Sequence, residues 1–308
     1  MSEIRISPWN RFEKAFKRSI LTPLTFLRYG STRPRRAKLH GSDNWIHIDP
    51  TDPCAIKKVV HEPLRGKVSP NLVFWREFNT HLKPGLVIDA GVNYGECLFG
   101  TNYDSSSTIH GFEANPRLIP HLENSRGDHP DGDRITIHNC LVSDTDAEEV
   151  PFYVNPAWSG SSSALSEITP REGNLEFKLP ARRIDGVIPA GEAAATTILI
   201  KMDIEGFESP ALRGLTGLLE TAAGALALIE FDIDYIRWAG QDPADYLGWL
   251  QERFDTYQLV DAKRRRLKPV ATLEDIPFLH GTDRKHTDLA LVLKGSREDW
   301  LAPGWSCS

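Results

Sequence analysis

Residues 86–97 read LVIDAGVNYGEC, a short apolar run that passes directly into a glycine-containing loop. In open α/β folds, a buried strand followed by such a loop brings the backbone close to a nucleotide, because side chains would hold the ligand away. The loop is not G-x-G-x-x-G, and Asp89 stands directly before it, where a carboxylate would repel a pyrophosphate. The stretch therefore predicts a site for a cofactor that carries a nucleoside but no pyrophosphate.

A second acid lies at the spacing that such a site requires. The next predicted strand ends with Glu113, 22 residues after Gly91, and an acid about 20 residues beyond the glycine loop accepts hydrogen bonds from ribose hydroxyls in nucleotide-binding folds. In the alternative interpretation, Asp89 caps a helix and Glu113 lies on the surface. We favour the cofactor site because both acids have the expected spacing, and a carboxylate at Asp89 suits the amino group of S-adenosylmethionine.

From Leu86 onward, short apolar runs alternate with segments that have apolar residues at helical spacing. This order predicts βαβ units in a parallel sheet, and the continuous apolar character of the runs predicts that helices cover both faces. Seven strands are expected, at residues 86–90, 108–114, 135–143, 197–203, 225–232, 256–261 and 288–294. Helices are expected within 117–126 and 209–222.

Two regions interrupt this rhythm. Residues 147–180 contain a small-residue turn between two strand-like runs and are expected to form an antiparallel flap. The sequence before the sheet contains a candidate amphipathic helix at residues 9–27. We therefore divide the chain into a basic N-terminal extension or cap (1–70), a cofactor-binding domain that includes the flap (71–295) and a C-terminal tail (296–308).

The formal net charge of -6 conceals an uneven distribution. Residues 1–40 contain ten basic and two acidic residues, so the rest of the chain contains 26 basic and 40 acidic ones. A basic arm could bind an anionic partner, a membrane surface or the acidic body of the protein itself. We favour a solvated or self-docked helix, and expect no nucleic-acid partner, because aromatic residues are not interleaved with the basic ones.

Several function classes are not indicated by the sequence. No apolar run approaches the roughly 20 residues that cross a bilayer, and no hydrophobic stretch precedes a small-residue cleavage site, so a cytoplasmic protein without a transmembrane segment is expected. The four cysteines are scattered without a C-x-x-C pair, and the histidines show no metal-ligand spacing. Neither a zinc site nor a disulfide framework is predicted.

Five motifs in consistent order resemble the FkbM family of S-adenosylmethionine-dependent methyltransferases. They are LVIDAGVNYGE (86–96), GFEANP (111–116), LVSDTDAEEVPFYVN (141–155) with GSSSAL (160–165), ILIKMDIEGFESPALRGL (198–215) and LIEFD (228–232). The resemblance covers roughly residues 84–235 and implies a Rossmann-like class I methyltransferase fold, with a seven-stranded, mostly parallel sheet and helices on both faces. Val92 departs from the alanine that is more usual in the family's loop, and the first 70 residues lie outside the resemblance.

The resemblance also implies which residues hold the cofactor. The residues that would frame its methionine end come from the glycine loop: Asp89, Gly91, Asn93 and Gly95. Glu113 would hold the ribose. Ser143 and Asp144, after the third strand, are candidates for the adenine side, although Asp144 could equally be a turn residue.

The end of the fourth strand carries the most suggestive chemistry, since ligands of open α/β sheets bind at the carboxyl ends of strands. Lys201 and Asp203 share one strand face, and Glu205 follows in the exit loop. A hydroxyl acceptor must lose its proton to a base, or to solvent with the help of a metal, so these three residues are the catalytic candidates. In the alternative, Lys201 only neutralises Asp203 or Glu230.

A metal ion is conceivable at the same place. Asp203, Glu230 and Asp232 lie at two adjacent predicted strand ends, and Mg²⁺ prefers oxygen ligands. Acids at strand ends also cap loops and contact cofactors directly. We therefore assign no metal site.

These observations predict an enzyme that transfers a methyl group from S-adenosylmethionine to a hydroxyl of a small molecule or glycan. Trp158 and the serines at 161–163 are expected to close over that acceptor, because they offer a flat apolar face and hydrogen bonds. The alternative is a scaffold that binds the cofactor without turnover and uses the basic N-terminal arm as its interaction surface.

Overall fold

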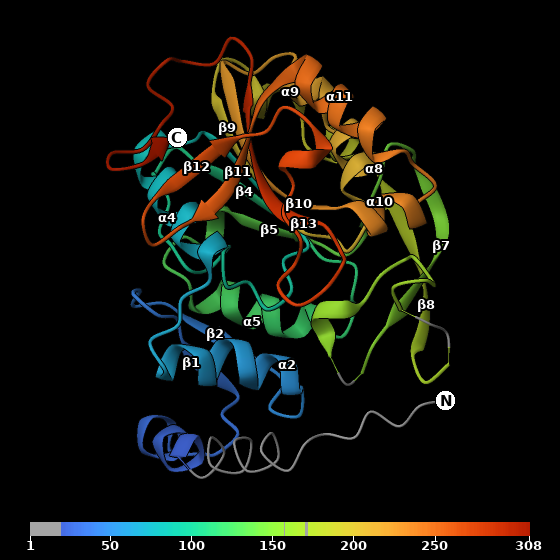
Figure 1. Cartoon of the computed structure of the whole chain (residues 1–308). Coiled ribbons are helices and arrows are strands. Elements are labelled where there is room, and N and C mark those ends of the chain that lie inside the picture. The colour runs from blue at the N-terminus through green and yellow to red at the C-terminus, as the bar shows by residue number, and fades with distance from the viewer. Residues whose placement is uncertain (1–19, 157, 170–171) are drawn as a thin grey trace.

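The computed structural model describes residues 20–156, 158–169 and 172–308 (Figure 1). Its centre is a nine-stranded sheet with the strand order β14-β12-β11-β13-β10-β9-β3-β4-β5. These strands are β3 (Leu86–Ala90), β4 (Thr108–Phe112), β5 (Ile135–His138), β9 (Thr197–Met202), β10 (Gly224–Asp232), β11 (Phe254–Asp261), β12 (Arg266–Pro269), β13 (His286–Leu293) and β14 (Ser306–Cys307). The five neighbouring strands β10, β9, β3, β4 and β5 are parallel to one another. In contrast, β13 is antiparallel to both of its neighbours, β10 and β11.

All seven predicted strands contribute to this sheet, which confirms the mostly parallel α/β architecture. The sequence did not predict β12 and β14, which extend the edge beyond β11. The predicted strand 135–143 is divided, because β5 ends at His138 and β6 (Leu141–Val142) joins a different sheet. Between them, the side chain of Asn139 donates hydrogen bonds to the carbonyl oxygens of Glu113 and Ala114, which turns the chain away from β4.

Residues of the central strands point alternately to two hydrophobic cores. In β3, Val87 packs with the cluster that contains Trp75 of α4 (Pro70–Leu82), whereas Ile88 packs with the cluster that contains Leu250 of α11 (Pro243–Arg253). The first face is covered by α4 and α5 (Ile119–Asp128), and the second by α6 (Ile184–Val187), α7 (Ala190–Ala193), α8 (Glu208–Arg213), α9 (Thr216–Leu219), α10 (Ile233–Trp238) and α11 (Figure 1). Burial on both faces accounts for the continuous apolar runs.

The predicted helix at residues 209–222 is two short helices, α8 and α9. Gly214 separates them, and a Cβ atom at this position would lie only 1.9 Å from the carbonyl oxygen of Ser143. The chain therefore needs a glycine where it passes the loop after β6, and the helix ends there.

The flap pairs in antiparallel fashion, as expected for residues 147–180. Its strands are β7 (Ala147–Val154) and β8 (Leu175–Arg182), and β6 adds to β8 to give a three-stranded sheet. The flap has its own small hydrophobic cluster, which includes Phe152 and Leu179. The 3-10 turn η3 (Ser159–Ser161) lies between β7 and β8 and reaches toward the centre of the molecule.

The segment before α4 forms a hairpin and a series of short helical turns. These elements are β1 (Arg36–Lys38), β2 (Trp45–His47), α2 (Pro53–Ala55), η1 (Ile56–His61) and α3 (Glu62–Leu64). η1 is a π-helix, in which the N–H of Glu62 donates to the carbonyl of Lys57. Pro63 follows directly, and the wider turn accommodates a residue that has no N–H and crowds the carbonyl four residues earlier.

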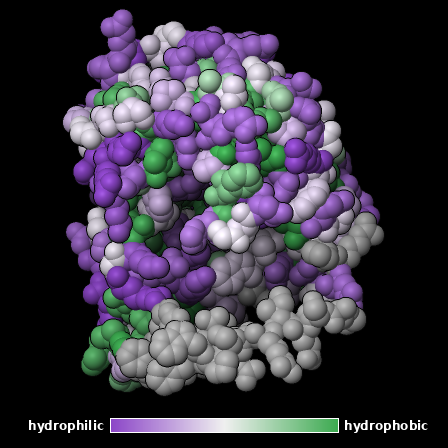
Figure 2. All heavy atoms as spheres, viewed as in Figure 1, coloured by the Kyte–Doolittle hydropathy of each residue, from purple (hydrophilic) through white to green (hydrophobic). Residues whose placement is uncertain are grey.

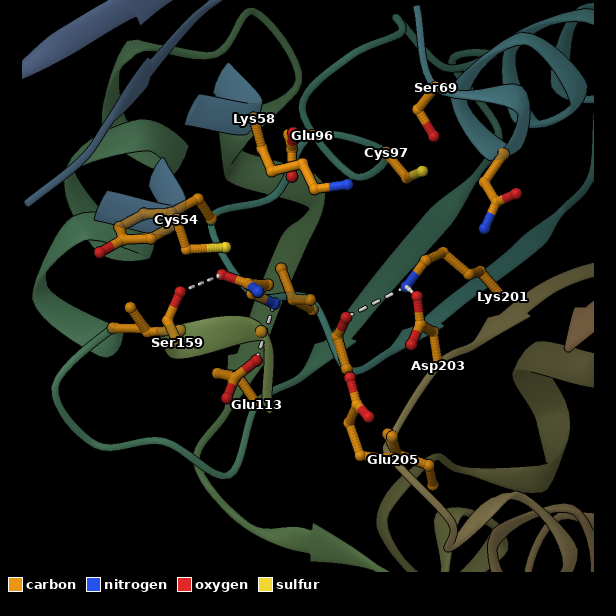
Figure 3. A pocket seen from close by; sticks show the side chains of 18 of the residues that line it. Cys54, Lys58, Ser69, Glu96, Cys97, Glu113, Ser159, Lys201, Asp203 and Glu205 are labelled. Atoms are coloured by element: carbon orange, nitrogen blue, oxygen red, sulfur yellow. Dashed lines mark hydrogen bonds and ion pairs between the residues drawn. The ribbon is translucent and has the colours of Figure 1, made fainter. Parts of the chain in front are cut away.

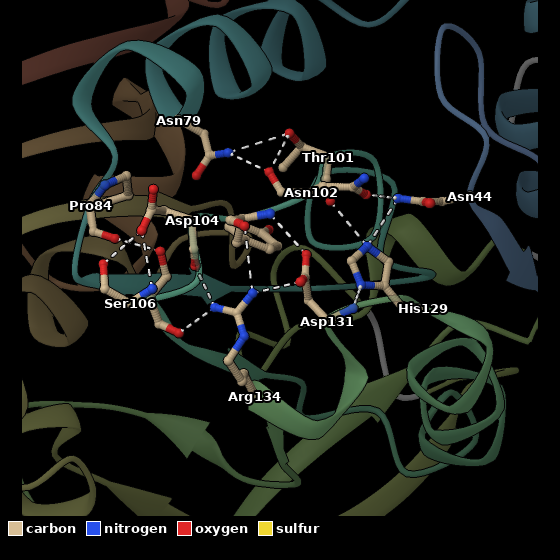
Figure 4. A network of polar contacts seen from close by, with 12 residues as sticks. Asn44, Asn79, Pro84, Thr101, Asn102, Asp104, Ser106, His129, Asp131 and Arg134 are labelled. Atoms are coloured by element: carbon tan, nitrogen blue, oxygen red, sulfur yellow. Dashed lines mark hydrogen bonds and ion pairs between the residues drawn. The ribbon is translucent and has the colours of Figure 1, made fainter.

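A polar network anchors the hairpin to the sheet (Figure 4). The side chain of Asn44 donates to the carbonyl oxygen of Phe99 (3.0 Å) and to the side-chain oxygen of Asn102 (2.9 Å). Asn79 of α4 donates to the carbonyl oxygen of Asn102 (2.9 Å). Ile46 of β2 is fully buried in the same core cluster as α4. The N-terminal segment is therefore held beside the carboxyl end of β3.

The remaining features concern the chain ends and the cysteines. Residues 20–29 are helical, and the rest of the amphipathic helix predicted at 9–27 lies outside the described residues. In the part of the chain that the structure describes, no helix combines the length and apolar character needed to cross a bilayer. All four cysteines are free. The proposed boundaries at residues 70 and 295 stay predictions.

Candidate functional site

A cavity of about 810 Å³ opens at the carboxyl ends of β3, β4 and β9 (Figure 3). Its inner wall consists of residues from the loop after β3 (91–97), the end of β4 (112–114) and the exit of β9 (201–205). Its outer wall consists of residues from the N-terminal segment (54–72) and from the flap (158–164). Open α/β sheets bind their ligands at this edge.

The glycine loop forms the floor of the inner wall. Gly91 has a φ of +78°, and a Cβ atom there would lie 1.8 Å from the carbonyl oxygen of Asp203. Asn93 adopts a φ of +52°, which asparagine tolerates better than most residues. Both residues line the cavity, but Gly95 does not. A Cβ at Gly95 would lie 2.3 Å from the ring of Phe99, so packing accounts for this glycine.

Glu113 lines the cavity beside this loop. Its two carboxylate oxygens accept hydrogen bonds from the backbone N–H groups of Asn93 and Asn115, each at 2.7 Å. Burial raises the pKa of Glu113 to about 7, although these two N–H donors oppose the shift. The group that is expected to hold a ribose therefore changes its charge near neutral pH.

Asp89 lies behind the wall rather than in it. Its side chain is fully buried, and its Oδ1 lies 3.2 Å from Nζ of Lys201, the residue directly opposite it in β9. Lys201 also donates to the carbonyl of Gly91 at 3.1 Å, and it is Lys201 that lines the cavity. Burial alone would lower the pKa of Lys201, but the carboxylates of Asp89 and Asp203 raise it above its ordinary value. Lys201 thus places a protonated ammonium group in the wall, and the carboxylate of Asp89 behind the wall balances its charge.

Three carboxyl groups line the same cavity as Lys201, those of Asp203, Glu205 and Glu230. The side chain of Asp203 is 41% exposed, whereas that of Glu230 is only 12% exposed. The carboxylate of Asp203 lies 4.0 Å from Nζ of Lys201. Asp203 is therefore the acid best placed to meet a second ligand.

Glu205 is held in an unusual backbone conformation. Its φ is +52°, its carbonyl oxygen accepts a hydrogen bond from the hydroxyl of Ser163 (2.8 Å), and the buried Glu208 accepts one from the N–H of Ile204 (2.8 Å). Non-glycine residues in this region cost about 1–3 kcal/mol and occur at functional sites. Burial, and the carboxylates of Asp203 and Glu208, raise the pKa of Glu205 to about 8. Glu205 can exchange a proton near neutral pH.

Asp232 does not join this group. It caps α10 by accepting hydrogen bonds from the N–H groups of Asp234 and Tyr235, and it forms an ion pair with Arg284. Among the residues that the structure describes, no set of three or more histidine, cysteine, aspartate or glutamate side chains is arranged to hold a metal ion.

Ser143 and Asp144 also lie outside the residues that line the cavity. The hydroxyl of Ser143 donates to the carboxylate of Asp144 at 3.3 Å. The wall near β4 is instead apolar and includes Leu118, Leu141 and Val142. The sequence did not single these residues out, because apolar residues at strand ends look like any other core positions.

The N-terminal part of the outer wall is the part of the cavity that the sequence did not reveal. It includes Lys57, Lys58 and Asn71, which precede the sheet and lie outside the motifs quoted above. Nζ of Lys57 lies 4.9 Å from the centre of the Trp158 ring, and the hydroxyl of Ser159 donates to the side chain of Asn93 (3.4 Å). The N-terminal segment and the flap therefore meet over the glycine loop.

A family model described as Methyltransferase FkbM domain matches residues 89–254. Among curated proteins, none matches the chain. The family match spans the glycine loop, the exit of β9 and the flap, but it does not include the N-terminal part of the outer wall.

Several solved structures resemble the chain at low sequence identity. Methyltransferase FkbM from Methylobacillus flagellatus is 19% identical with a TM-score of 0.38, and the match covers 68% of this chain and 44% of that one. An O-methyltransferase from Bacillus cereus in complex with SAH is 11% identical with a TM-score of 0.38, covering 74% and 82% of the two chains. The O-methyltransferase TomG from Streptomyces achromogenes is 10% identical with a TM-score of 0.40, covering 80% and 91%.

Proposed function

Because the chain belongs to the FkbM family of methyltransferases and has a Rossmann-like class I α/β fold, we propose that it transfers the methyl group of S-adenosylmethionine to a hydroxyl of a small molecule or glycan. One observation carries this proposal. The glycine loop with Glu113, which suits a nucleoside, and the pair of Lys201 and Asp203, which suits proton transfer, line the same cavity.

The cavity fits the cofactor in its chemistry. Gly91 and Asn93 would lie along the methionine part, and Glu113 would accept hydrogen bonds from the ribose hydroxyls. The apolar Leu118 and Val142 would contact the adenine ring. Asp89 would act through Lys201, whose ammonium group it holds in the wall. When bound, the cofactor supplies an electrophilic methyl group on its sulfonium.

The catalytic proposal rests on the carboxylate of Asp203. It would accept the proton of the acceptor hydroxyl, a role that requires a base within hydrogen-bond reach of that hydroxyl. Lys201 would compensate the negative charge at this wall and hold the orientation of the acid. Glu205 would serve as a second proton carrier, since its pKa of about 8 allows both protonation states near neutral pH.

The outer wall supports a hydroxylated acceptor. Trp158 offers a flat apolar face, and Asn71 and Ser162 offer hydrogen-bonding groups in the same cavity. Ser163 is committed to the carbonyl of Glu205 and would position that residue instead of binding the acceptor. A sugar ring or a small hydroxylated ring fits this combination of surfaces.

The first experiment is calorimetric titration of the purified chain with S-adenosylmethionine, S-adenosylhomocysteine and NAD, with and without Mg²⁺. Saturable binding of both adenosyl ligands, and none of NAD, is the expected result. Release of S-adenosylhomocysteine is then assayed against a panel of monosaccharides, nucleotide sugars and small phenols to identify an acceptor. Binding of NAD in place of the adenosyl ligands would refute the proposed function.

The affinity for S-adenosylhomocysteine is expected to rise with pH. A carboxylate accepts ribose hydrogen bonds better than a carboxylic acid, and with a pKa of about 7 Glu113 is roughly one-tenth ionised at pH 6 and nine-tenths at pH 8. The dissociation constant should therefore fall about tenfold between these pH values and level off above them. Calorimetry at pH 6 and pH 8 measures the change.

Glu113→Gln provides the control for this pH dependence. The amide cannot ionise, so the variant should bind weakly at both pH values, with little difference between them. A wild-type affinity that does not change between pH 6 and pH 8 would show that ionisation of Glu113 does not control binding. A variant that keeps the wild-type dependence would assign the titration to another group.

A further inference from the structure

The helix at residues 20–29 exposes an unusual amount of apolar surface. The described residues include nine exposed large hydrophobic side chains, and four of them lie on this single helix: Ile20 (45% exposed), Leu24 (41%), Phe26 (55%) and Leu27 (80%). Leu21 and Thr25 face the other way and are buried. At 100° per residue, the four exposed side chains and Pro23 share one side of the helix, and this side carries no charged residue within 20–29.

A groove rich in arginine follows this helix directly. It has a volume of about 490 Å³ and is lined by Arg28, Tyr29, Ser31, Arg33, Pro34, Arg35, Arg36 and Trp45, without any acidic residue. Arg36 lies 4.6 Å from the centre of the Trp45 ring and 3.6 Å from the carboxylate of Asp128. Within the described parts of the chain, the other three arginines of this groove form no ion pair with a carboxylate. The groove therefore presents unneutralised positive charge next to an apolar ridge.

We propose that the helix 20–29 and the arginine groove together bind the surface of an anionic lipid bilayer. The apolar side chains would enter the boundary between headgroups and acyl chains, as amphipathic helices do at membrane surfaces. The guanidinium groups would bind lipid phosphates, and Tyr29 and Trp45 have the amphipathic rings found at the level of the headgroups. Figure 2 shows hydrophobic residues at the lower left, where Figure 1 places this helix.

The charge distribution of the whole chain would orient the protein on such a surface. Residues 1–40 carry ten basic and two acidic residues, whereas the rest of the chain carries 26 basic and 40 acidic ones. An anionic bilayer would attract the N-terminal end and repel the acidic body, each basic residue near the surface contributing to the attraction. The apolar ridge distinguishes this surface from one that binds a nucleic acid, because a phosphate backbone offers no place to bury Leu24 and Leu27.

The test is co-sedimentation of the full chain with sucrose-loaded vesicles. Vesicles of phosphatidylcholine with 30% phosphatidylglycerol are compared with vesicles of phosphatidylcholine alone. We expect the chain to bind the anionic vesicles and to bind neutral vesicles at least tenfold more weakly. The double variant Leu24→Ser/Leu27→Ser should lose at least tenfold in partitioning to anionic vesicles. The control is Phe278→Ser/Leu279→Ser, which removes two exposed apolar side chains outside the helix 20–29. It should bind like the wild type.

A second pair of variants tests the charge. Arg33→Glu/Arg35→Glu should lose at least tenfold in binding to anionic vesicles, whereas Arg264→Glu/Arg266→Glu, at exposed sites elsewhere, should not. All four double variants should keep the wild-type unfolding temperature and affinity for S-adenosylhomocysteine, because none of the exchanged residues lines the cavity. These readouts separate the membrane proposal from the proposed enzymatic function.

Three outcomes would overturn the membrane proposal. One is a wild type that does not bind anionic vesicles. Another is a Leu24→Ser/Leu27→Ser variant that binds as the wild type does, which would make the surface a purely electrostatic patch that could equally bind a single-stranded RNA 30-mer. The third is a wild-type dimer that becomes a monomer in Leu24→Ser/Leu27→Ser by sedimentation velocity, without vesicle binding, which would make the ridge a contact between two copies of the chain.

Discussion

Exchange of Asp203 for asparagine is expected to lower kcat about 10²–10⁴-fold. Asparagine has the same size and keeps one hydrogen-bond acceptor, but its amide cannot take up the proton of the acceptor hydroxyl. The affinity for S-adenosylhomocysteine should stay within about twofold of the wild-type value, because the carboxylate of Asp203 is assigned to the acceptor and not to the cofactor. Both quantities are measured on the same preparation, kcat with the acceptor that the panel identifies.

The matched control for this variant is Asp133→Asn, which makes the same exchange at an exposed site in η2 (Gly132–Arg134), outside the cavity. It should turn over at the wild-type rate. An Asp203→Asn variant that retains more than half of the wild-type kcat would remove Asp203 from the proton transfer. Catalysis would then depend on orientation of the acceptor or on Glu205, and Glu205→Gln would become the informative variant.

Exchange of Lys201 for methionine is expected to lower the free energy of unfolding by about 3–5 kcal/mol, because it leaves the fully buried carboxylate of Asp89 without its positive partner. The double variant Asp89→Leu/Lys201→Met should recover most of this loss, since apolar groups can replace a buried ion pair at little cost. Urea denaturation monitored by circular dichroism measures all three proteins.

The same exchange at an exposed ion pair provides the control. Lys178 lies 2.8 Å from Glu149 on the surface of the flap, and Lys178→Met should leave the urea midpoint unchanged. If Lys201→Met were as stable as the wild type, Asp89 would have to be protonated in the folded protein, and Asp89 and Lys201 would not form an ion pair. The double variant should remain inactive even where its stability recovers, which separates structure from catalysis.

The sheet and the glycine loop could be predicted from the sequence because both are local patterns. The seven apolar runs have the length and continuity of buried strands, and the distance from Gly91 to Glu113 reflects the chain that connects the carboxyl ends of two neighbouring parallel strands, β3 and β4. Both residues indeed line one cavity. Gly95 shows the limit of this reasoning, because a glycine needed to pack against Phe99 and a glycine that contacts a ligand have the same one-letter code.

The partner of Lys201 could not be predicted for a different reason. The sequence indicated that a lysine inside an apolar strand needs an acid, and the candidate partners were Asp203 and Glu230. The closest acid in the structure is Asp89, which faces Lys201 across the parallel pair of β3 and β9. The register of two strands separated by 112 positions is fixed by packing, so a single sequence does not contain it in readable form.

The N-terminal part of the outer wall was missed because nothing in its own sequence pattern marks it as part of a site. Lys57 and Lys58 belong to a π-helical turn before the sheet, and they reach the cavity only because Asn44 and the buried β2 anchor that segment. Long-range contacts of this kind decide which residues can face an acceptor. This part of the wall precedes all five family motifs in the chain.

The carboxyl groups around the cavity make protons a ligand of the folded chain. The groups in question have pKa values of about 7 for Glu113 and Glu208, about 8 for Glu205 and about 6 for Asp288, all above the ordinary range of a carboxyl group in an unfolded chain. Between pH 4 and pH 8 these four groups therefore bind more protons in the folded state than in the unfolded state, and their contribution to stability decreases as the pH rises. At Glu113, a proton and the ribose of the cofactor compete for the same oxygen atoms. Protonation of Glu113, which favours the folded state, thus works against the occupation of the site.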